Sequence, residues 1–225
     1  MTLRSLQDQL GYQFQDEKLL KLALTHRSLG RDEEGAASNQ RLEFLGDSVL
    51  GLVIARMLYD LFPSEPEGDL SRRLVGLVNG ERLAEIATEM NLGEALLMSA
   101  GEVEQGGRTN ASNLEDACEA LLGAAYLDGG VAAVEGIVKR FWQHYAVAAK
   151  TPPKDPKTAL QEWAQARSLA LPDYVVISSD GPSHAPHFVI EVRVANHPPA
   201  RGEAGNKKLA ERLAAVAMLA TLTKQ

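Results

Sequence analysis

The sequence predicts an all-helical first segment and a smaller α+β second segment with the element order α-β-β-β-α. Three observations predict this division. Apolar residues recur at helical spacing almost throughout before residue 146, and the stretch 146–157 (AVAAKTPPKDPK) has three prolines and three lysines, as a linker would. After that stretch the apolar residues alternate instead. We therefore expect a helical domain over 1–148, a linker over 149–155 and an α+β domain over 156–225.

Apolar residues three and four positions apart define the helices of the first segment. Three such runs are Leu42, Leu45, Val49, Val53 and Met57; then Leu70, Leu74 and Leu77; then Leu121, Leu122 and Tyr126. Glycine and proline punctuate the segment at Gly30, Gly35, 63–68, Gly93, 106–107 and 129–130. We expect several helices joined by short loops.

The second segment begins with a short helix over 158–167. Strands are expected over 173–178, over 188–194, where Phe188, Ile190, Val192 and Val194 alternate with other residues, and near 199–204. A final helix over 207–223 carries Leu209, Leu213 and Val216 on one face. This order suggests a three-stranded antiparallel sheet with both helices on one face.

Composition excludes several classes of protein. The longest nearly uncharged apolar stretch, 213–222, is far shorter than the roughly 20 residues of a membrane span. The first residues have no apolar core typical of a secretory signal, and one cysteine, Cys118, cannot form an internal disulfide. We expect a cytoplasmic protein with no membrane partner.

Charge differs between the two segments. Residues 1–150 contain 14 basic and 23 acidic residues, whereas 151–225 contain 9 and 7, so the net charges are −9 and +2. A polyanion requires only local positive charge, so the second segment is the candidate for contacting one. The acidic first segment needs a different explanation.

Two pairs of carboxylates occur at helical spacing. Glu43 and Asp47 are four residues apart, and Asp116 and Glu119 are three apart, so each pair shares a helix face. A single helical acid is more often a solvated surface residue. Asp47, however, follows Gly46 in an apolar run, and both residue types are poor in helix interiors. We expect the two pairs to point inward and to converge.

Converging carboxylates need a compensating charge. Each like-charge pair near 4 Å costs on the order of 4 kcal/mol at an effective dielectric of 20, and no Lys or Arg lies one turn from both members of either pair. All-oxygen ligands favour Mg²⁺ or Mn²⁺ over Zn²⁺. The sequence has no Glu-x-x-His for a di-iron bundle and no His-Asp doublet for a helical phosphohydrolase. Carboxylate-held Mg²⁺ is well suited to phosphodiester hydrolysis.

Residues 39–50 (NQRLEFLGDSVL) resemble the signature of ribonuclease III, the double-stranded-RNA endonuclease. Further matches follow at 25–28 (THRS), 67–71 (EGDLS), 101–102 with 106–107, and 116–123, and the tail from Asp155 resembles a double-stranded-RNA-binding domain. The resemblance implies a homodimer in which two metal sites across one RNA-binding valley each cut one strand. Products would carry 5′-phosphate and 3′-hydroxyl ends, and precursors of ribosomal RNA and structured messenger RNA are the implied substrates.

The resemblance also implies roles for particular residues. Glu43, Asp47, Asp116 and Glu119 would bind Mg²⁺, with Mn²⁺ as a substitute and no small-molecule cofactor. Asp47 and Glu119 would be catalytic, Glu119 by positioning the attacking water. Glu67 matches an acid at the valley but would equally suit a solvated loop, and Phe44 matches a dimer-interface residue but would equally suit the core.

Two positions depart from the family pattern. The position before Arg41 is often Glu, whereas Gln40 stands here; it cannot be a negative ligand but can still hydrogen-bond RNA. Residues 109–111 are less basic than in many relatives, so that loop offers fewer phosphate contacts.

RNA-binding residues are expected in the second segment. Lys207 and Lys208 fall in the first turn of a helix, where cations oppose the helix dipole and an anionic partner such as phosphate resolves the conflict. His184, Gln161 and Glu162 match minor-groove contacts of the family, although exposed residues of these types are usually only solvated. Such domains recognise the A-form shape and 2′-hydroxyls of double-stranded RNA.

Two alternatives remain at this point. The chain could bind structured RNA without cutting it, as a nuclease fold that has lost its acids would. It could also be a helical interaction protein whose acids are merely structural, although that leaves the basic tail unexplained.

Overall fold

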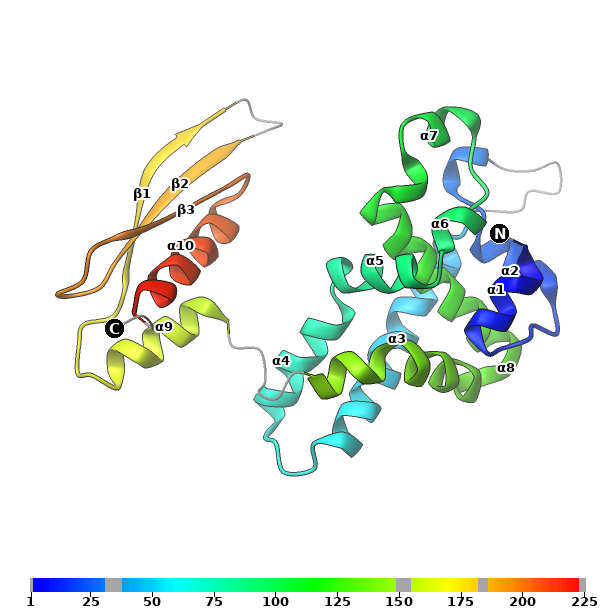
Figure 1. The fold of residues 1–225 in the computed structure, drawn as a ribbon, viewed down its shortest axis with the longest axis horizontal. Coiled ribbons are helices and arrows are strands. Elements are labelled where there is room, and N and C mark those ends of the chain that lie inside the picture. The colour runs from blue at the N-terminus through cyan, green and yellow to red at the C-terminus, as the bar shows by residue number, and fades with distance from the viewer. Residues whose placement is uncertain (1, 31–37, 149–154, 182–185, 223–225) are drawn as a thin grey trace. The chain divides into compact units, whose positions relative to one another are not determined.

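The computed structural model describes residues 2–30, 38–148, 155–181 and 186–222. The chain divides into two compact units, Met1–Pro153 and Lys154–Gln225 (Figure 1). The first unit is helical and the second combines a sheet with two helices, so the predicted fold class is confirmed.

Helices make up nearly all regular structure in the described part of the first unit, with one isolated bridge between Thr25 and Leu97. The α-helices are α1 (Leu3–Leu10), α2 (Glu17–Ala23), α3 (Gln40–Leu61), α4 (Glu67–Val78), α5 (Gly80–Glu89), α6 (Leu92–Ala95), α7 (Ala100–Glu104) and α8 (Ala111–Ala148). Two 3₁₀ turns, η1 (Arg27–Leu29) and η2 (Gly107–Thr109), precede α3 and α8.

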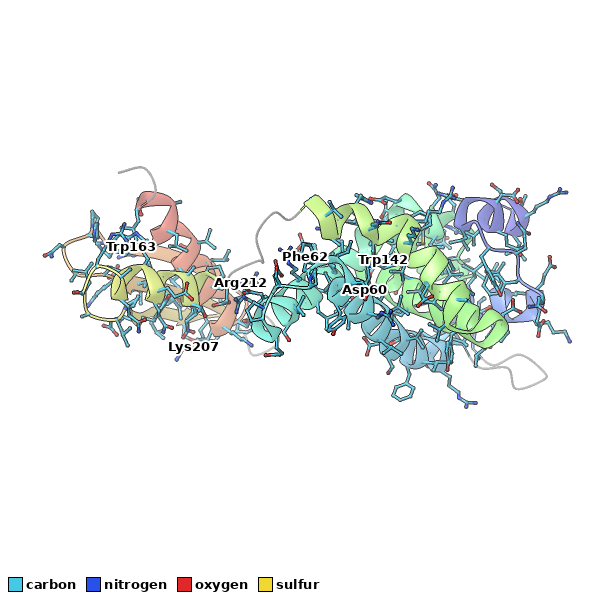
Figure 2. All side chains as sticks on the ribbon, turned by 90° about the horizontal axis from the view of Figure 1, so that it is seen from below. Asp60, Phe62, Trp142, Trp163, Lys207 and Arg212 are labelled. Carbon is cyan, nitrogen blue, oxygen red and sulfur yellow. The ribbon has the colours of Figure 1, made fainter. Side chains whose placement is uncertain are left out.

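Helices α3 and α8 form the centre of this unit (Figure 1). Their apolar faces bury Leu50 and Ile54 from α3 and Leu121 from α8. Trp142 of α8 is fully buried, and its indole N–H donates to the Leu77 carbonyl at 3.0 Å; Figure 2 shows it among the helices. The buried indole therefore has the partner that its polar N–H requires.

The expected break at residues 129–130 is a kink rather than a loop. Gly130 alone leaves the helical conformation (φ 68°, ψ −165°), and α8 continues beyond it. Just before the kink, the Asp128 carboxylate accepts from the Tyr12 hydroxyl at 2.6 Å and from the amides of Gln15 and Asp16 at 2.9 Å. The kink thus coincides with the attachment of the N-terminal helices.

Helix α8 is, among the described residues, the one helix long and apolar enough to cross a membrane by length and composition. Half of its most apolar window is buried inside the fold, and Gly130 interrupts it. It therefore has the character of a central core helix.

The second unit contains α9 (Pro156–Gln165), β1 (Asp173–Asp180), β2 (His187–Arg193), β3 (Ala200–Ala204) and α10 (Lys207–Leu222). The sheet is antiparallel in the order β1-β2-β3. Both helices contribute to one core, in which Leu160 packs with Val192, Ala214 and Met218. Helix α9 begins two residues earlier than predicted because Asp155 caps it and Pro156 suits the first turn.

Candidate active site

The crossing of α3 and α8 brings the two backbones into direct contact. A Cβ atom on Gly46 would lie 1.8 Å from the Glu119 carbonyl oxygen, and one on Gly123 would lie 2.2 Å from the Leu42 carbonyl oxygen. Only glycine fits at either position. The two predicted acid pairs flank this contact, with Glu43 and Asp47 beside Gly46 and Asp116 and Glu119 before Gly123.

Specific hydrogen bonds fix the start of each acid-bearing helix. The Asn39 amide, just before α3, donates to the Thr25 carbonyl at 2.9 Å. Asn110 caps α8 by accepting from the amides of Ser112 and Asn113 at 3.0 and 3.2 Å.

The buried side chain of Asn113 then ties the first turn of α8 to the preceding loop. Its Nδ2 donates to the Glu102 carboxylate at 2.9 Å and to the Gly107 carbonyl at 3.1 Å. The motif at 101–107 therefore supports the helix that carries Asp116 and Glu119.

Glu119 has the most perturbed carboxyl of the set. Burial, followed by the charges of Asp47, Glu115, Glu43 and Asp116, raises its pKa from the ordinary value of 4.5 to about 8. A carboxyl that keeps its proton at neutral pH is typical of a functional site. The influence of both α3 acids on Glu119 indicates that the two helices bring the four predicted acids into one electrostatic group.

The other acids of this group are also perturbed. Burial and then Asp116 raise the pKa of Glu43, and burial raises the pKa of Asp116. Burial and the charge of Asp116 likewise raise the pKa of Glu115, an acid that the sequence analysis did not single out. The sequence feature that could have identified Glu115 is its position next to Asp116.

Positive charge reaches the acids from a loop distant in sequence. Arg27 acts to lower the pKa values of both Glu43 and Asp116, and His26 acts to lower that of Asp116. Helical spacing alone could not reveal these two neighbours, although the motif at 25–28 contains both. Arg27 is exposed, whereas His26 is buried.

The inward orientation expected for all four acids is wrong for one of them. Glu43, Asp116 and Glu119 are half-buried, but Asp47 is exposed, because it lies on the solvent side of α3 next to the helix crossing. Within the described residues, no three His, Cys, Asp or Glu side chains are drawn together closely enough to hold a metal ion. The acids surround a common region without converging on one point.

The donor set nevertheless fits a hard divalent cation. All four predicted ligands are carboxylates, and none of them forms an ion pair with another described residue. Burial and then repulsion by the other acids raise the pKa of Glu119, and a bound cation would offset both.

The remaining predicted residues of the first unit lie at the surface. Gln40 begins α3 and accepts from the Ser38 hydroxyl at 3.1 Å, and Glu67 begins α4 and accepts from the Ser71 hydroxyl at 2.7 Å. Phe44 is 78% exposed, which excludes the core alternative for this residue. Leu52 and Tyr59 on the same face of α3 are 61% and 68% exposed.

In the second unit, Lys207 and Lys208 open α10 and are exposed (Figure 2 labels Lys207). The Asn206 side chain accepts from the Leu209 amide at 2.8 Å, which caps this helix beneath the lysines. Gln161 and Glu162 are exposed on α9, and His184 lies outside the described residues.

Comparison with known families matches both units. The family described as Ribonuclease-III-like matches residues 16–145, and the double-stranded RNA binding motif matches residues 156–222. A protein named Ribonuclease 3 from Anaplasma phagocytophilum (strain HZ) is 50% identical over 216 residues, covering 96% of this chain and 90% of that protein. Ribonuclease 3 from Ehrlichia canis (strain Jake) is 41% identical and covers 99% of each.

A solved structure also resembles the first unit. The nuclease domain of ribonuclease III from Campylobacter jejuni is 40% identical, with a TM-score of 0.59, and covers 64% of this chain and 95% of that one. A second structure of that domain, with the same identity and TM-score, is described as showing flexibility in a region involved in dimer formation.

Proposed function

This chain belongs to the ribonuclease III family of double-stranded-RNA endonucleases, and on that premise we propose that Glu43, Asp47, Asp116 and Glu119 form its metal-binding catalytic site. The observation that carries the proposal is the backbone contact of α3 and α8 at Gly46 and Gly123, which sets the two acid pairs on adjoining helices. The pKa of Glu119, raised by burial and then by the charges of its acidic neighbours, is in keeping with it. The intact acid set argues against a binding module that no longer cuts, and the RNA-binding second unit argues against a purely structural protein.

The proposed reaction is hydrolysis. A bond forms between a water oxygen and phosphorus, the P–O3′ bond breaks, and the products carry a 5′-phosphate and a 3′-hydroxyl. A bound divalent cation would lower the pKa of water and neutralise the scissile phosphate. Glu119 would orient the attacking water, and Asp47, exposed at the edge of the group, would face the incoming RNA.

We assign Mg²⁺ as the natural cation, with Mn²⁺ as a substitute, because every donor is a carboxylate oxygen. Between about pH 4.5 and 8, folded Glu119 holds a proton that the unfolded chain releases, so its contribution to stability falls as pH rises through this window. A cation must displace the same proton, so metal binding weakens below about pH 8.

Metal-induced stabilisation should therefore increase with pH. We expect Mn²⁺ to raise the Tm of RNA-free protein more at about pH 8.5 than at about pH 6. At the higher pH, fewer molecules carry a proton on Glu119 that the cation must displace. Thermal unfolding with and without Mn²⁺ at both values measures this. An equal rise at both would contradict the role of Glu119 as a ligand.

Lys207 and Lys208 are proposed to contact RNA phosphates, and Gln161, Glu162 and His184 to contact the minor groove. In the first unit, Gln40 is proposed to hydrogen-bond RNA and Glu67 to lie at the RNA-binding valley. Replacing both lysines with alanine should weaken binding to RNA duplexes of any sequence. Each lost phosphate contact lowers the slope of log affinity against log salt by roughly one. Lys139→Ala, on exposed α8 surface, is the control that changes charge elsewhere. An unchanged slope in the double variant would remove the lysines from the interface.

We propose a homodimer that uses the exposed apolar face of α3. Phe44, Leu52 and Tyr59 share this face, and an apolar hollow of about 460 Å³ beside Tyr59 extends it toward α4. Several large apolar side chains exposed on one side of a helix are typical of a subunit interface. In a dimer, two metal sites would act on opposite strands of one duplex.

The variant Phe44→Asp should convert the dimer to a monomer, because it places a charge where an aromatic ring would be buried. Sedimentation velocity measures the state, and Leu171→Asp, at an exposed apolar residue of the second unit, is the control. A dimer that survives Phe44→Asp would exclude this face.

We further propose a cytoplasmic location and structured cellular RNA, including ribosomal precursors, as substrate.

A further inference from the structure

Three lysines at helix starts in the second unit have different surroundings. Lys157 falls in the first turn of α9, and Lys207 and Lys208 fall in the first turn of α10, so all three oppose a helix dipole. Lys207 and Lys208 are exposed and form no ion pair within the described residues. Lys157 differs from them, because its charge is already compensated inside the unit.

A carboxylate of α10 compensates Lys157. Its Nζ lies 2.5 Å from Oε2 of Glu211, and the two side chains are 34% and 17% exposed. The ammonium also lies over the ring of Tyr174 on β1, 4.6 Å from the ring centroid. The side chain of Lys157 therefore joins α9 to α10 and to β1, and its charge is directed into the unit.

The ion pair lies one helical turn from an apolar contact between the two helices. Leu160 of α9 packs with Ala214 and Met218 of α10, and all three side chains are fully buried. Apolar contacts are non-directional, so they hold the helices together without defining one position of α9 along α10. A charged pair has a defined geometry, and fixing the register of packed elements is the best-attested role of shielded pairs.

The register of α9 and α10 matters because both helices are proposed to contact RNA. Gln161 lies one turn after Lys157 on α9, and Lys207 lies one turn before Glu211 on α10. A domain of this kind spans about 16 base pairs and contacts two successive minor grooves and the phosphates between them. The spacing of the minor-groove helix and the phosphate-binding helix must therefore match the duplex.

We propose that Lys157 and Glu211 are positioning residues that hold α9 and α10 in the register that duplex RNA requires, without contacting RNA themselves. The inference rests on the proposed function, in which Gln161 contacts the minor groove and Lys207 and Lys208 contact phosphates. It deepens that function by giving one basic and one acidic residue of this unit a role inside the fold.

The direction of the effect of Glu211→Gln separates this role from an effect of charge alone. Glu211 lies one turn from two lysines proposed to bind phosphate, so loss of its negative charge would tighten RNA binding if charge alone decided. The positioning role predicts weaker binding, because an uncharged amide pairs more weakly with the ammonium of Lys157. Lys157→Met, which keeps an unbranched side chain, removes the other half of the pair.

The experiment titrates a labelled RNA duplex with the metal-free, full-length protein at several salt concentrations, far below the Tm of each variant. We expect Glu211→Gln, Lys157→Met and the double variant each to lose about fivefold in affinity, because all three lack the same contact. The slope of log affinity against log salt should stay at the wild-type value, since no phosphate contact is lost. Glu203→Gln, the same chemical change on the exposed surface of β3, is the matched control and should bind as wild type does.

Tighter binding by Glu211→Gln would overturn the positioning role, and so would a salt slope lowered by roughly one in Lys157→Met, which would make this lysine a phosphate contact. Losses that add in the double variant, or wild-type affinity in both single variants with or without a lower Tm, would also overturn it. Failure of the proposed function is distinguishable, because replacing Lys207 and Lys208 with alanine would then leave the salt slope unchanged.

Discussion

Replacing Glu119 with glutamine should abolish RNA cleavage while leaving duplex binding nearly intact. The substitution keeps the size of the side chain and removes the carboxyl group that would become a carboxylate ligand when a cation binds, at the position where burial and four neighbouring acids raise the pKa to about 8. Losing a group that positions the attacking water costs on the order of 10²–10⁴ in rate. The residues of α9 and α10 that we propose to bind RNA lie in the other unit and are unchanged.

The measurement is single-turnover cleavage of a labelled duplex, paired with a native-gel binding titration. Glu104→Gln, the same chemical change on the exposed surface of α7, is the matched control and should cut normally. Metal-free Glu119→Gln protein should also gain stability relative to wild type as pH rises from about 4.5 to 8, with the full difference above about pH 8, because the variant has no buried carboxyl to ionise. Cleavage within tenfold of wild type would remove Glu119 from the site.

Replacing Gly46 with alanine should have a comparable effect through the backbone. The added methyl would meet the Glu119 carbonyl oxygen at 1.8 Å, so α3 and α8 must separate at the crossing that sets the spacing of the acids. We expect a loss of about 3 kcal/mol in the free energy of unfolding, the upper range for overpacking. Displacing catalytic groups by about 1 Å costs roughly 10²-fold in rate.

Chemical denaturation and the single-turnover assay measure the two effects of Gly46→Ala. Gly136→Ala is the matched control, because an added Cβ there has no neighbour within 4 Å. Alanine is the better helix former, so this control should be neutral or slightly stabilising. If Gly46→Ala folds and cuts like wild type, the close crossing does not set the geometry of the site.

Gly46 shows which part of the site could be predicted from the sequence. Its presence in an apolar helical run beside Asp47 was recognisable as a conflict with helix propensity, and the conflict pointed to the correct segment. Glycine is required at this position because its backbone contacts a helix more than 70 residues away in the sequence. No local sequence pattern indicates that contact. Periodicity therefore predicted both helices but not how closely they approach.

The arrangement of the acid group was likewise predictable only in part. The i, i+3 and i, i+4 spacing placed each pair on one helix face, and the structure brings the pairs together. Asp47 is exposed rather than inward, and Arg27 supplies the nearby positive charge that was missing at helical spacing. Loops that fold back on a helix are set by tertiary packing, so these neighbours required the structure.

The element bounds of the α+β unit were the more predictable part, but the buried face of α10 was not. The expected apolar face with Leu209, Leu213 and Val216 is 41–46% exposed, and Ala210, Ala214 and Met218 are buried instead.

Strand alternation gave the bounds of β2 nearly to the residue. Its burial does not alternate, because Glu191 is buried between Ile190 and Val192, where it accepts from Arg193 and Arg201.

The kink at Gly130 was harder, because two adjacent glycines are equally compatible with a loop and with a helix that bends at one residue. In the structure, bonds from Tyr12, Gln15 and Asp16 hold Asp128 just before the bend, which no pattern around the two glycines indicates.

The central claim is that this chain uses a carboxylate-held cation to cut double-stranded RNA. The most direct test incubates the protein with a long perfect RNA duplex, with and without Mg²⁺, and resolves the products on a denaturing gel. We predict Mg²⁺-dependent shortening to fragments with 5′-phosphate ends. An intact duplex that still shifts on a native gel would contradict the claim and identify a protein that binds RNA without cutting it.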